Sequence, residues 1–135
     1  AFIEDEKGNK VDIVSSGQTI RVVINYQMKN KKDKNISFAF ALNNSSKKEQ
    51  LSDIWTDNLP ANLSAKGKVI CELPCIPLNT GRYTFNVCIR INGFVSLFIK
   101  DMISFEVVFG DFFGTGRLPS ENQGSLLLKQ NWSIK

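Results

Sequence analysis

The sequence predicts an all-β fold, a sandwich or a barrel, on three observations. Apolar and polar residues alternate with a period of two in most of the apolar segments. Turn-forming residues separate these segments at intervals of about 8 to 15 residues, a spacing typical of sandwiches and barrels. Helical periodicity is nearly absent. The chain has 135 residues, which suits a single domain.

The segment over residues 82–91 shows the clearest alternation. Its odd-numbered residues are apolar, whereas Thr84, Asn86 and Arg90 alternate with them on the opposite side. The same pattern predicts further strands over residues 19–27, 36–42, 69–73, 95–99 and 103–109. Shorter strands are predicted near residues 2–3, 11–14 and 54–55, and one helical turn around residues 48–53. Between two of the strands, Asn92-Gly93 has the composition of a two-residue type I′ hairpin turn.

The last part of the chain differs in character from the rest. Residues 1–109 are predicted to form the sandwich, and residues 110–135 a glycine-punctuated loop and a terminal strand of the same domain. The apolar residues of that strand, between Ser125 and Trp132, must pack on a surface. Either the chain's own sandwich or that of a second copy provides this surface, and the periodicity does not decide between them.

Composition excludes several functional classes. The net charge is +4, but the lysine runs at residues 29–34 and 47–48 lie among Asn, Asp and Ser, as in solvated hairpin tips. They contain no interleaved aromatic residues, so nucleic-acid binding is not expected. No apolar stretch is long enough to span a membrane, and no direct membrane insertion is expected. The chain begins without Met or a signal peptide, which suggests a piece of a longer protein.

The residues needed for most catalytic sites are missing. There is no histidine, hence no Ser-His-Asp or Cys-His arrangement and no histidine metal site. The three cysteines form no CxxC pair and are expected to be free thiols in a reducing compartment. We therefore expect no metal, no cofactor and no catalysis. A glycosidase that uses two strand carboxylates stays open as an alternative.

The outward side chains of the central strands suit sugar binding. Amides, hydroxyls and a guanidinium hydrogen-bond sugar hydroxyls, and an aromatic ring stacks on the apolar face of a pyranose. Thr84, Asn86 and Arg90 supply the polar row, and Ser37 begins a floor of small residues if its strand lies in the same sheet. Trp55 is the candidate stacking ring.

Three segments resemble one known family. They are Ser16 to Tyr26 with its Ser-Gly-Gln-Thr-Ile-Arg start, Leu78 to Val87 with Asn-Thr-Gly-Arg-Tyr, and Ile103 to Val107. The closing segment Gly110 to Pro119, followed by Gly124 and Trp132, is similar to the ends of such chains. In this order they resemble the C-terminal domain of Wzt-type proteins. These are the ATPase subunits of ABC transporters that export O-antigen polysaccharide in Gram-negative bacteria.

The resemblance implies an immunoglobulin-like antiparallel β-sandwich, jelly-roll-like in outline, on the cytoplasmic side of the inner membrane. It implies a carbohydrate-binding module that recognises the terminus of lipid-linked O-polysaccharide and acts with the transporter's membrane subunit. Homodimers are usual in the family, and exchange of the C-terminal strand is known there. The chain lacks a Walker A sequence, so it is not expected to hydrolyse ATP. Arg90 and Arg21 suggest an acidic sugar or a phosphate at the recognised end. A purely structural sandwich without a glycan ligand is the alternative.

Overall fold

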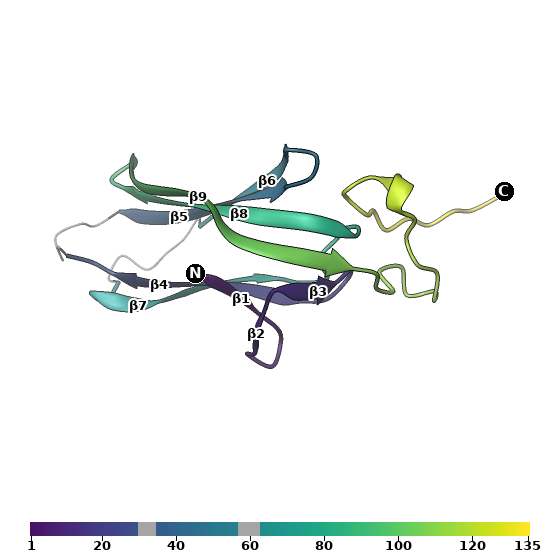
Figure 1. Ribbon diagram of the computed structural model, residues 1–135, viewed down its shortest axis with the longest axis horizontal. Coiled ribbons are helices and arrows are strands. Elements are labelled where there is room, and N and C mark those ends of the chain that lie inside the picture. The colour runs from purple at the N-terminus through teal and green to yellow at the C-terminus, as the bar shows by residue number, and fades with distance from the viewer. Residues whose placement is uncertain (30–34, 57–62) are drawn as a thin grey trace.

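The chain folds into two β-sheets that face each other, as expected for a sandwich (Figure 1). The computed structural model describes residues 1–29, 35–56 and 63–135. One sheet has the strand order β2 (Lys10–Val11), β1 (Phe2–Glu4), β4 (Ile20–Gln27) and β7 (Lys66–Leu73). The other has the order β3 (Ile13–Ser15), β9 (Phe94–Val108), β8 (Gly81–Ile91), β5 (Ile36–Asn44) and β6 (Glu49–Trp55). The predicted all-β sandwich is confirmed.

Neighbouring strands run antiparallel except β3 and β9, which pair in parallel over Glu106 to Val108. A short 3₁₀ helix, η1 (Glu121–Gln123), follows the sheets in the C-terminal segment. Within the described ranges, no helix has the length and apolar character needed to cross a membrane.

A column of aromatic rings fills the space between the sheets. Phe85 stacks on Phe105 with ring centres 5.4 Å apart, and Tyr83 stacks on the other side of Phe105 at 5.8 Å. Phe40 meets Phe85 edge-on at 5.9 Å. All four residues are buried. Each such side chain stabilises the fold by about 1.5–3 kcal/mol relative to exposure to water, so this column fixes β5, β8 and β9 against one another.

Tyr83 also ties the start of β8 to the chain that precedes it. Its side chain is fully buried, and its hydroxyl donates a 2.8 Å hydrogen bond to the backbone carbonyl of Asn79. A tyrosine that bonds back to the backbone a few residues upstream is a recurrent feature of immunoglobulin-like sandwiches. Burial raises the pKa of Tyr83 to about 12, because the ionised phenolate would lose its hydration.

The prediction for residues 48–53 is wrong, since most of this segment belongs to the strand β6. β6 is an edge strand whose side chains are mostly exposed, so its sequence carries no apolar alternation. Its strand conformation comes from pairing with β5. Residues 95–99 and 103–109, predicted as two strands, lie in one long strand, β9, which is irregular around Asp101, a residue with φ of 49°.

The hairpin between β8 and β9 has the predicted turn. Asn92 and Gly93 both have positive φ, at 52° and 82°, as a type I′ turn requires. Asn92 N–H donates to the carbonyl of Asn35 at 2.8 Å, which links the turn to the start of β5. The turn therefore brings the ends of β5, β8 and β9 together at one end of the sandwich.

The C-terminal segment packs on its own chain at the other end of the sandwich, and its last buried residue is Leu127 (Figure 1). Buried Asn79 donates through Nδ2 to the carbonyls of Ser120 and Gly124, at 2.8 and 3.0 Å. The predicted terminal strand is reduced to one isolated bridge between Leu78 and Leu126. Beyond it the apolar side chains are exposed, at Leu128, Trp132 and Ile134.

Candidate functional site

Four of the strands place small and polar side chains on the outer face of the five-stranded sheet. The residues of β5 and β8 that point away from the core face each other in pairs. These pairs are Ser37 with Arg90, Ala39 with Cys88, Ala41 with Asn86, and Asn43 with Thr84. The predicted strand over residues 36–42 therefore lies in the same sheet as the strand over 82–91, which is the condition for a shared floor.

Aromatic residues close this floor on both sides. Trp55 of β6 pairs with Ala39, and Phe98 of β9 pairs with Cys88 on the other side. One row across the sheet therefore reads Trp55, Ala39, Cys88, Phe98. Strands in a sheet lie about 4.8 Å apart, which puts the backbones of the two aromatic residues about 14 Å apart. Both rings are exposed, Trp55 at 40% and Phe98 at 56%. We call this strip of the outer face, with an exposed ring on each side of two small side chains, the trough.

Arg90 lies against the first of these walls. Its guanidinium carbon is 4.3 Å from the centre of the Trp55 ring, the geometry of a cation–π contact. Its Nε is buried and has no hydrogen-bond partner among the described residues. Buried polar atoms are nearly always paired, and an orphaned donor costs free energy. A ligand acceptor at this position would pair it.

The polar end of the trough is organised around Asp101. Thr84 donates through Oγ1 to Asp101 Oδ1 at 2.9 Å, and the backbone N–H of Asp101 donates to Asn86 Oδ1 at 2.8 Å. Thr84 is buried, so its hydroxyl acts mainly inside this network. This bond holds the amide oxygen of Asn86, so its NH₂ group is the part of the side chain that can donate to a ligand. Asn86 is thus a positioned donor beside Ala41.

Sequence reasoning missed two members of this face, Asp101 and Phe98. Asp101 stands between two apolar runs, and its positive φ reflects a bulge that interrupts the pairing of β8 with β9. An acidic residue between two strand-like runs was the available signal for the bulge. The position of Phe98 opposite Cys88 depends on this register and carries no sequence signal.

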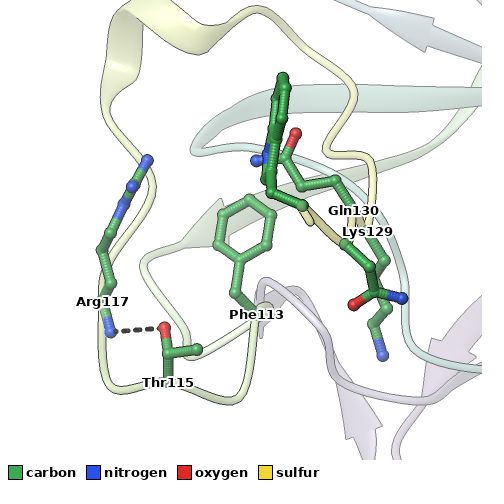
Figure 2. A pocket seen from close by; sticks show the side chains of 7 residues that line it. Phe113, Thr115, Arg117, Lys129 and Gln130 are labelled. Atoms are coloured by element: carbon green, nitrogen blue, oxygen red, sulfur yellow. Dashed lines mark hydrogen bonds between the residues drawn. The ribbon is translucent and has the colours of Figure 1, made fainter. Parts of the chain in front are cut away.

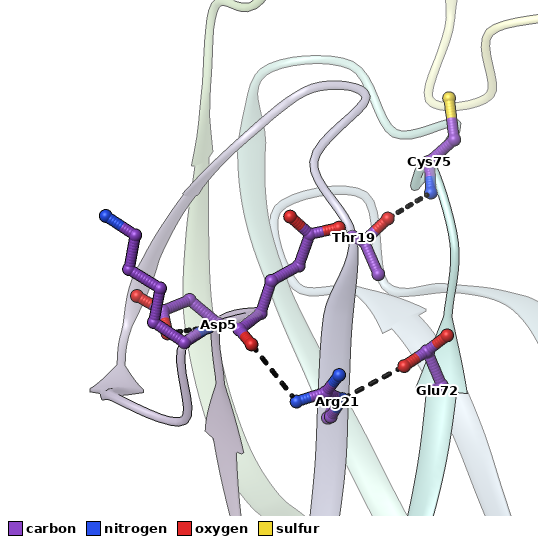
Figure 3. Close-up of polar contacts among 7 residues, drawn as sticks. Asp5, Thr19, Arg21, Glu72 and Cys75 are labelled. Carbon is purple, nitrogen blue, oxygen red and sulfur yellow. Dashed lines mark hydrogen bonds and ion pairs between the residues drawn. The ribbon is translucent and has the colours of Figure 1, made fainter.

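Arg21 does not belong to this site, although it was a candidate. It lies on β4 in the other sheet, where its Nε donates to Glu72 on β7 at 3.0 Å (Figure 3). Its Nη1 donates to the carbonyl of Glu6 at 3.3 Å. The structure therefore brings together Arg90, Asn86, Thr84, Ser37 and Trp55 on one face and leaves Arg21 on another sheet.

Among the described residues, the two aspartates of this face do not form a glycosidase-type pair. Its aspartates, Asp53 on β6 and Asp101 on β9, lie on strands whose backbones are about 14 Å apart. Glycosidase carboxylates stand about 5 to 10 Å apart. No group of three His, Cys, Asp or Glu suited to a metal ion occurs within residues 1–29, 35–56 and 63–135. Burial raises the pKa of the Cys71 thiol, which disfavours a reactive thiolate.

The comparisons with known proteins agree with this architecture. The family model of the Wzt C-terminal domain matches residues 1–118. This chain belongs to the Wzt C-terminal domain family. A solved structure described as the crystal structure of the C-terminal domain of Wzt has a TM-score of 0.68 and is 12% identical. The match covers 99% of this chain and 80% of that one. No curated protein matches at a significant level.

The Wzt C-terminal domain assignment confirms the resemblance found in three sequence segments. It also identifies the chain as a different part of a Wzt protein from the nucleotide-binding domain. At 12% identity the structural likeness shows the fold alone. The residues of the trough are therefore argued from their own geometry, and none is transferred from the relative.

Proposed function

We propose that this domain is a non-catalytic carbohydrate-binding module that recognises the terminus of lipid-linked O-antigen polysaccharide. In a parent protein carrying the ATPase portion, it would act at the cytoplasmic face of the inner membrane together with the transporter's membrane subunit. Binding a finished chain end would license export. The domain would make no covalent change to the glycan.

One observation carries the proposal: the contact between Arg90 and Trp55 beside a floor of small side chains. A pyranose ring has an apolar face that stacks on an indole, and its hydroxyls accept hydrogen bonds from a guanidinium. Ala39 and Ala41 leave room for a ring to approach the sheet, and Asn86 offers further donors. The trough is open rather than deep. Each sugar bond replaces a bond to water, so weak to moderate affinity is expected.

The ligand that fits Arg90 best is a sugar that carries a carboxylate or a phosphate. Among the described residues the only ion pair is that of Arg21 with Glu72, so Arg90 has no carboxylate within salt-bridge distance. A charged acceptor forms a stronger hydrogen bond with a guanidinium than a neutral one does. We therefore extend the proposal to an acidic terminal residue or a phosphate cap.

NMR titration of the domain with the O-polysaccharide of its source strain tests the binding site. The expected result is movement of the Trp55 indole N–H signal and of backbone amides in β5 and β8. In the same titration, the backbone amide signals of the other sheet, in β1, β4 and β7, are expected to stay in place. If no signal moves at millimolar glycan, the binding proposal is contradicted. The alternative function, a structural sandwich without a ligand, is then favoured.

The unpaired edge of β9 supports the alternative, a structural role in dimerisation. Within the described chain, the side of β9 away from β8 pairs only at Glu106 to Val108, with β3. Residues 94–105 therefore present unpaired backbone groups together with exposed Phe94 and Val95. Such an edge is a template for another strand. We propose that a second copy of the chain covers it in a homodimer.

Light scattering on the intact domain and on a chain truncated after Leu128 tests the dimer. A dimer that persists after truncation means that β9 pairs with β9 of the second copy. A dimer that is lost means that the C-terminal residues are exchanged. A monomer in both cases at high concentration contradicts the homodimer. Glycan binding measured on the same samples separates the two proposals.

A further inference from the structure

A pocket lies at the end of the sandwich far from the trough, between the C-terminal loop and the last residues of the chain. Its volume is about 270 Å³, and it is lined by Phe113, Thr115, Arg117, Lys129, Gln130, Asn131 and Trp132. Figure 2 shows Phe113 between Arg117 on one side and Lys129 and Gln130 on the other. Arg90 lies near the opposite end of β8, so the trough and this pocket are separate sites.

The loop that carries Phe113 and Arg117 is held by its own hydrogen bonds. Asp111 accepts from the backbone N–H of Gly116 through Oδ1 at 3.0 Å, and its carbonyl accepts from Gly114 N–H at 3.3 Å. Both glycines have positive φ, at 71° and 78°, which this tight turn requires. Phe113 packs edge-on against the buried ring of Phe112 at 5.2 Å. One wall of the pocket is therefore preformed.

The pocket is positively charged without an acidic neighbour in its lining. Arg117 lies 6.0 Å from the ring centre of Phe113, and Lys129 lies 5.6 Å from that of Phe112. None of the lining residues is acidic, and the Asp111 carboxylate is engaged by Gly116. Within the described residues neither cation has a carboxylate within salt-bridge distance. Two such cations beside one pocket favour an anion.

The remaining lining residues have the chemistry of a sugar site. Trp132 is 87% exposed, and an unpartnered indole offers a flat apolar face. The amides of Gln130 and Asn131 and the hydroxyl of Thr115 are donors and acceptors for ring hydroxyls. A volume of 270 Å³ is at the small end for ligand pockets, which suits a single ring rather than a chain of sugars.

We infer that this pocket binds one anionic sugar residue, a uronate or a sugar phosphate, independently of the trough on the sheet. Arg117 and Lys129 pair with the anionic group, and Trp132 covers the ring. The site exists when residues 129–132 lie against the loop of their own chain. It gives the domain a second contact with an acidic glycan, so a glycan long enough to reach both sites gains avidity.

The two tryptophans make the inference testable, because Trp55 lies in the trough and Trp132 in the pocket. The intact domain is titrated with glucose 1-phosphate, glucuronate, glucose and inorganic phosphate, and both indole N–H signals are followed by NMR. We expect the Trp132 signal to move with the two anionic sugars and to move little with glucose. Failure of the Trp132 signal to move at millimolar anionic sugar overturns the inference. Equal affinity for inorganic phosphate overturns the assignment to a sugar.

Variants identify the residues and exclude the other site. Arg117→Gln is expected to weaken glucose 1-phosphate binding, followed at the Trp132 signal, at least about tenfold, a change of about 1.4 kcal/mol. Leu118→Ala, also exposed in the loop, is the matched control and is expected to bind normally. Arg117→Gln with unaltered affinity contradicts the role of the cation. A Trp132 shift that is lost in Arg90→Gln but persists in Arg117→Gln assigns the effect to the trough instead.

Discussion

The guanidinium of Arg90 lies 4.3 Å from the centre of the Trp55 indole ring, although the two residues belong to strands that are not neighbours. Next to this pair, the intervening strand β5 places Ser37, Ala39 and Ala41 on the face, and these side chains are too small to separate the two residues. The arrangement stacks the guanidinium over the indole ring at one end of the trough. The account of glycan binding depends on this pair.

Substitution of Arg90 separates its charge from its shape. Arg90→Lys keeps the charge but loses the planar fork and the stacking on Trp55, so glycan affinity is expected to fall. Arg90→Gln also removes the charge, so its glycan affinity is expected to be lower still. The total loss relative to wild type is at least about tenfold, or about 1.4 kcal/mol. Calorimetry at two salt concentrations measures both variants, and added salt is expected to weaken wild-type binding. Arg21→Gln is the matched control on the other sheet. Equal affinity of the Arg90 and Arg21 variants would contradict the assignment.

Filling the floor of the trough should block the ligand by steric exclusion. In Ala41→Phe the new ring projects from β5 between Asp53 and Asn86, on the face away from the core. We expect loss of glycan binding with little change in the thermal midpoint, because no core residue is displaced. Calorimetry and thermal unfolding measure the two effects. Normal binding by a folded Ala41→Phe protein would mean that the glycan does not contact this face.

Removal of the Tyr83 hydroxyl should lower stability and change its pH dependence. Tyr83→Phe loses the hydrogen bond to Asn79, worth about 1 kcal/mol. In the wild type, the folded state keeps the phenol protonated up to a pKa of about 12, whereas the unfolded chain releases the proton near pH 10.0. Folded protein therefore binds more protons in this window, and stability falls as pH rises from 10 to 12. The difference between wild type and variant, from denaturant unfolding, should shrink across that window. A constant difference would refute the burial argument.

Loss of the Asn79 side chain should release the C-terminal segment. Asn79→Ala removes the amide that donates to the carbonyls of Ser120 and Gly124, and each lost hydrogen bond costs about 0.5–1.5 kcal/mol. Hydrogen exchange of the amides of residues 123–127 is expected to accelerate, while β4 and β8 stay protected. Asn122→Ala, exposed in the same segment, serves as control and should exchange like the wild type. Unchanged exchange in Asn79→Ala would place the anchor elsewhere.

The sequence predicts those elements whose residues alternate between core and solvent. Phe38, Phe40 and Leu42 of β5, and Tyr83, Phe85 and Val87 of β8, are apolar at every second position, and both strands occur as expected. β6 could not be predicted in full, because an exposed edge strand does not need an apolar residue at every second position. Its conformation comes from pairing with β5, a long-range interaction that leaves no local signal.

The part of the site that lies on a single strand was predictable, because alternate residues of a strand point to the same side of the sheet. Thr84, Asn86 and Arg90 share a face because they are separated by even numbers of residues. Which strands adjoin that face is a matter of topology, and this is why Phe98 and Asp101 were missed. The assignment of Arg21 to the other sheet is equally a property of strand order.

Calorimetric titration of the domain with the native O-polysaccharide, intact and trimmed at its terminus, decides whether the domain recognises the end of a glycan. We expect measurable binding of the intact glycan, loss of binding after trimming, and loss of binding in Arg90→Gln. Equal binding of intact and trimmed chains would contradict end recognition. Binding of neither form would contradict a glycan-binding function for this domain.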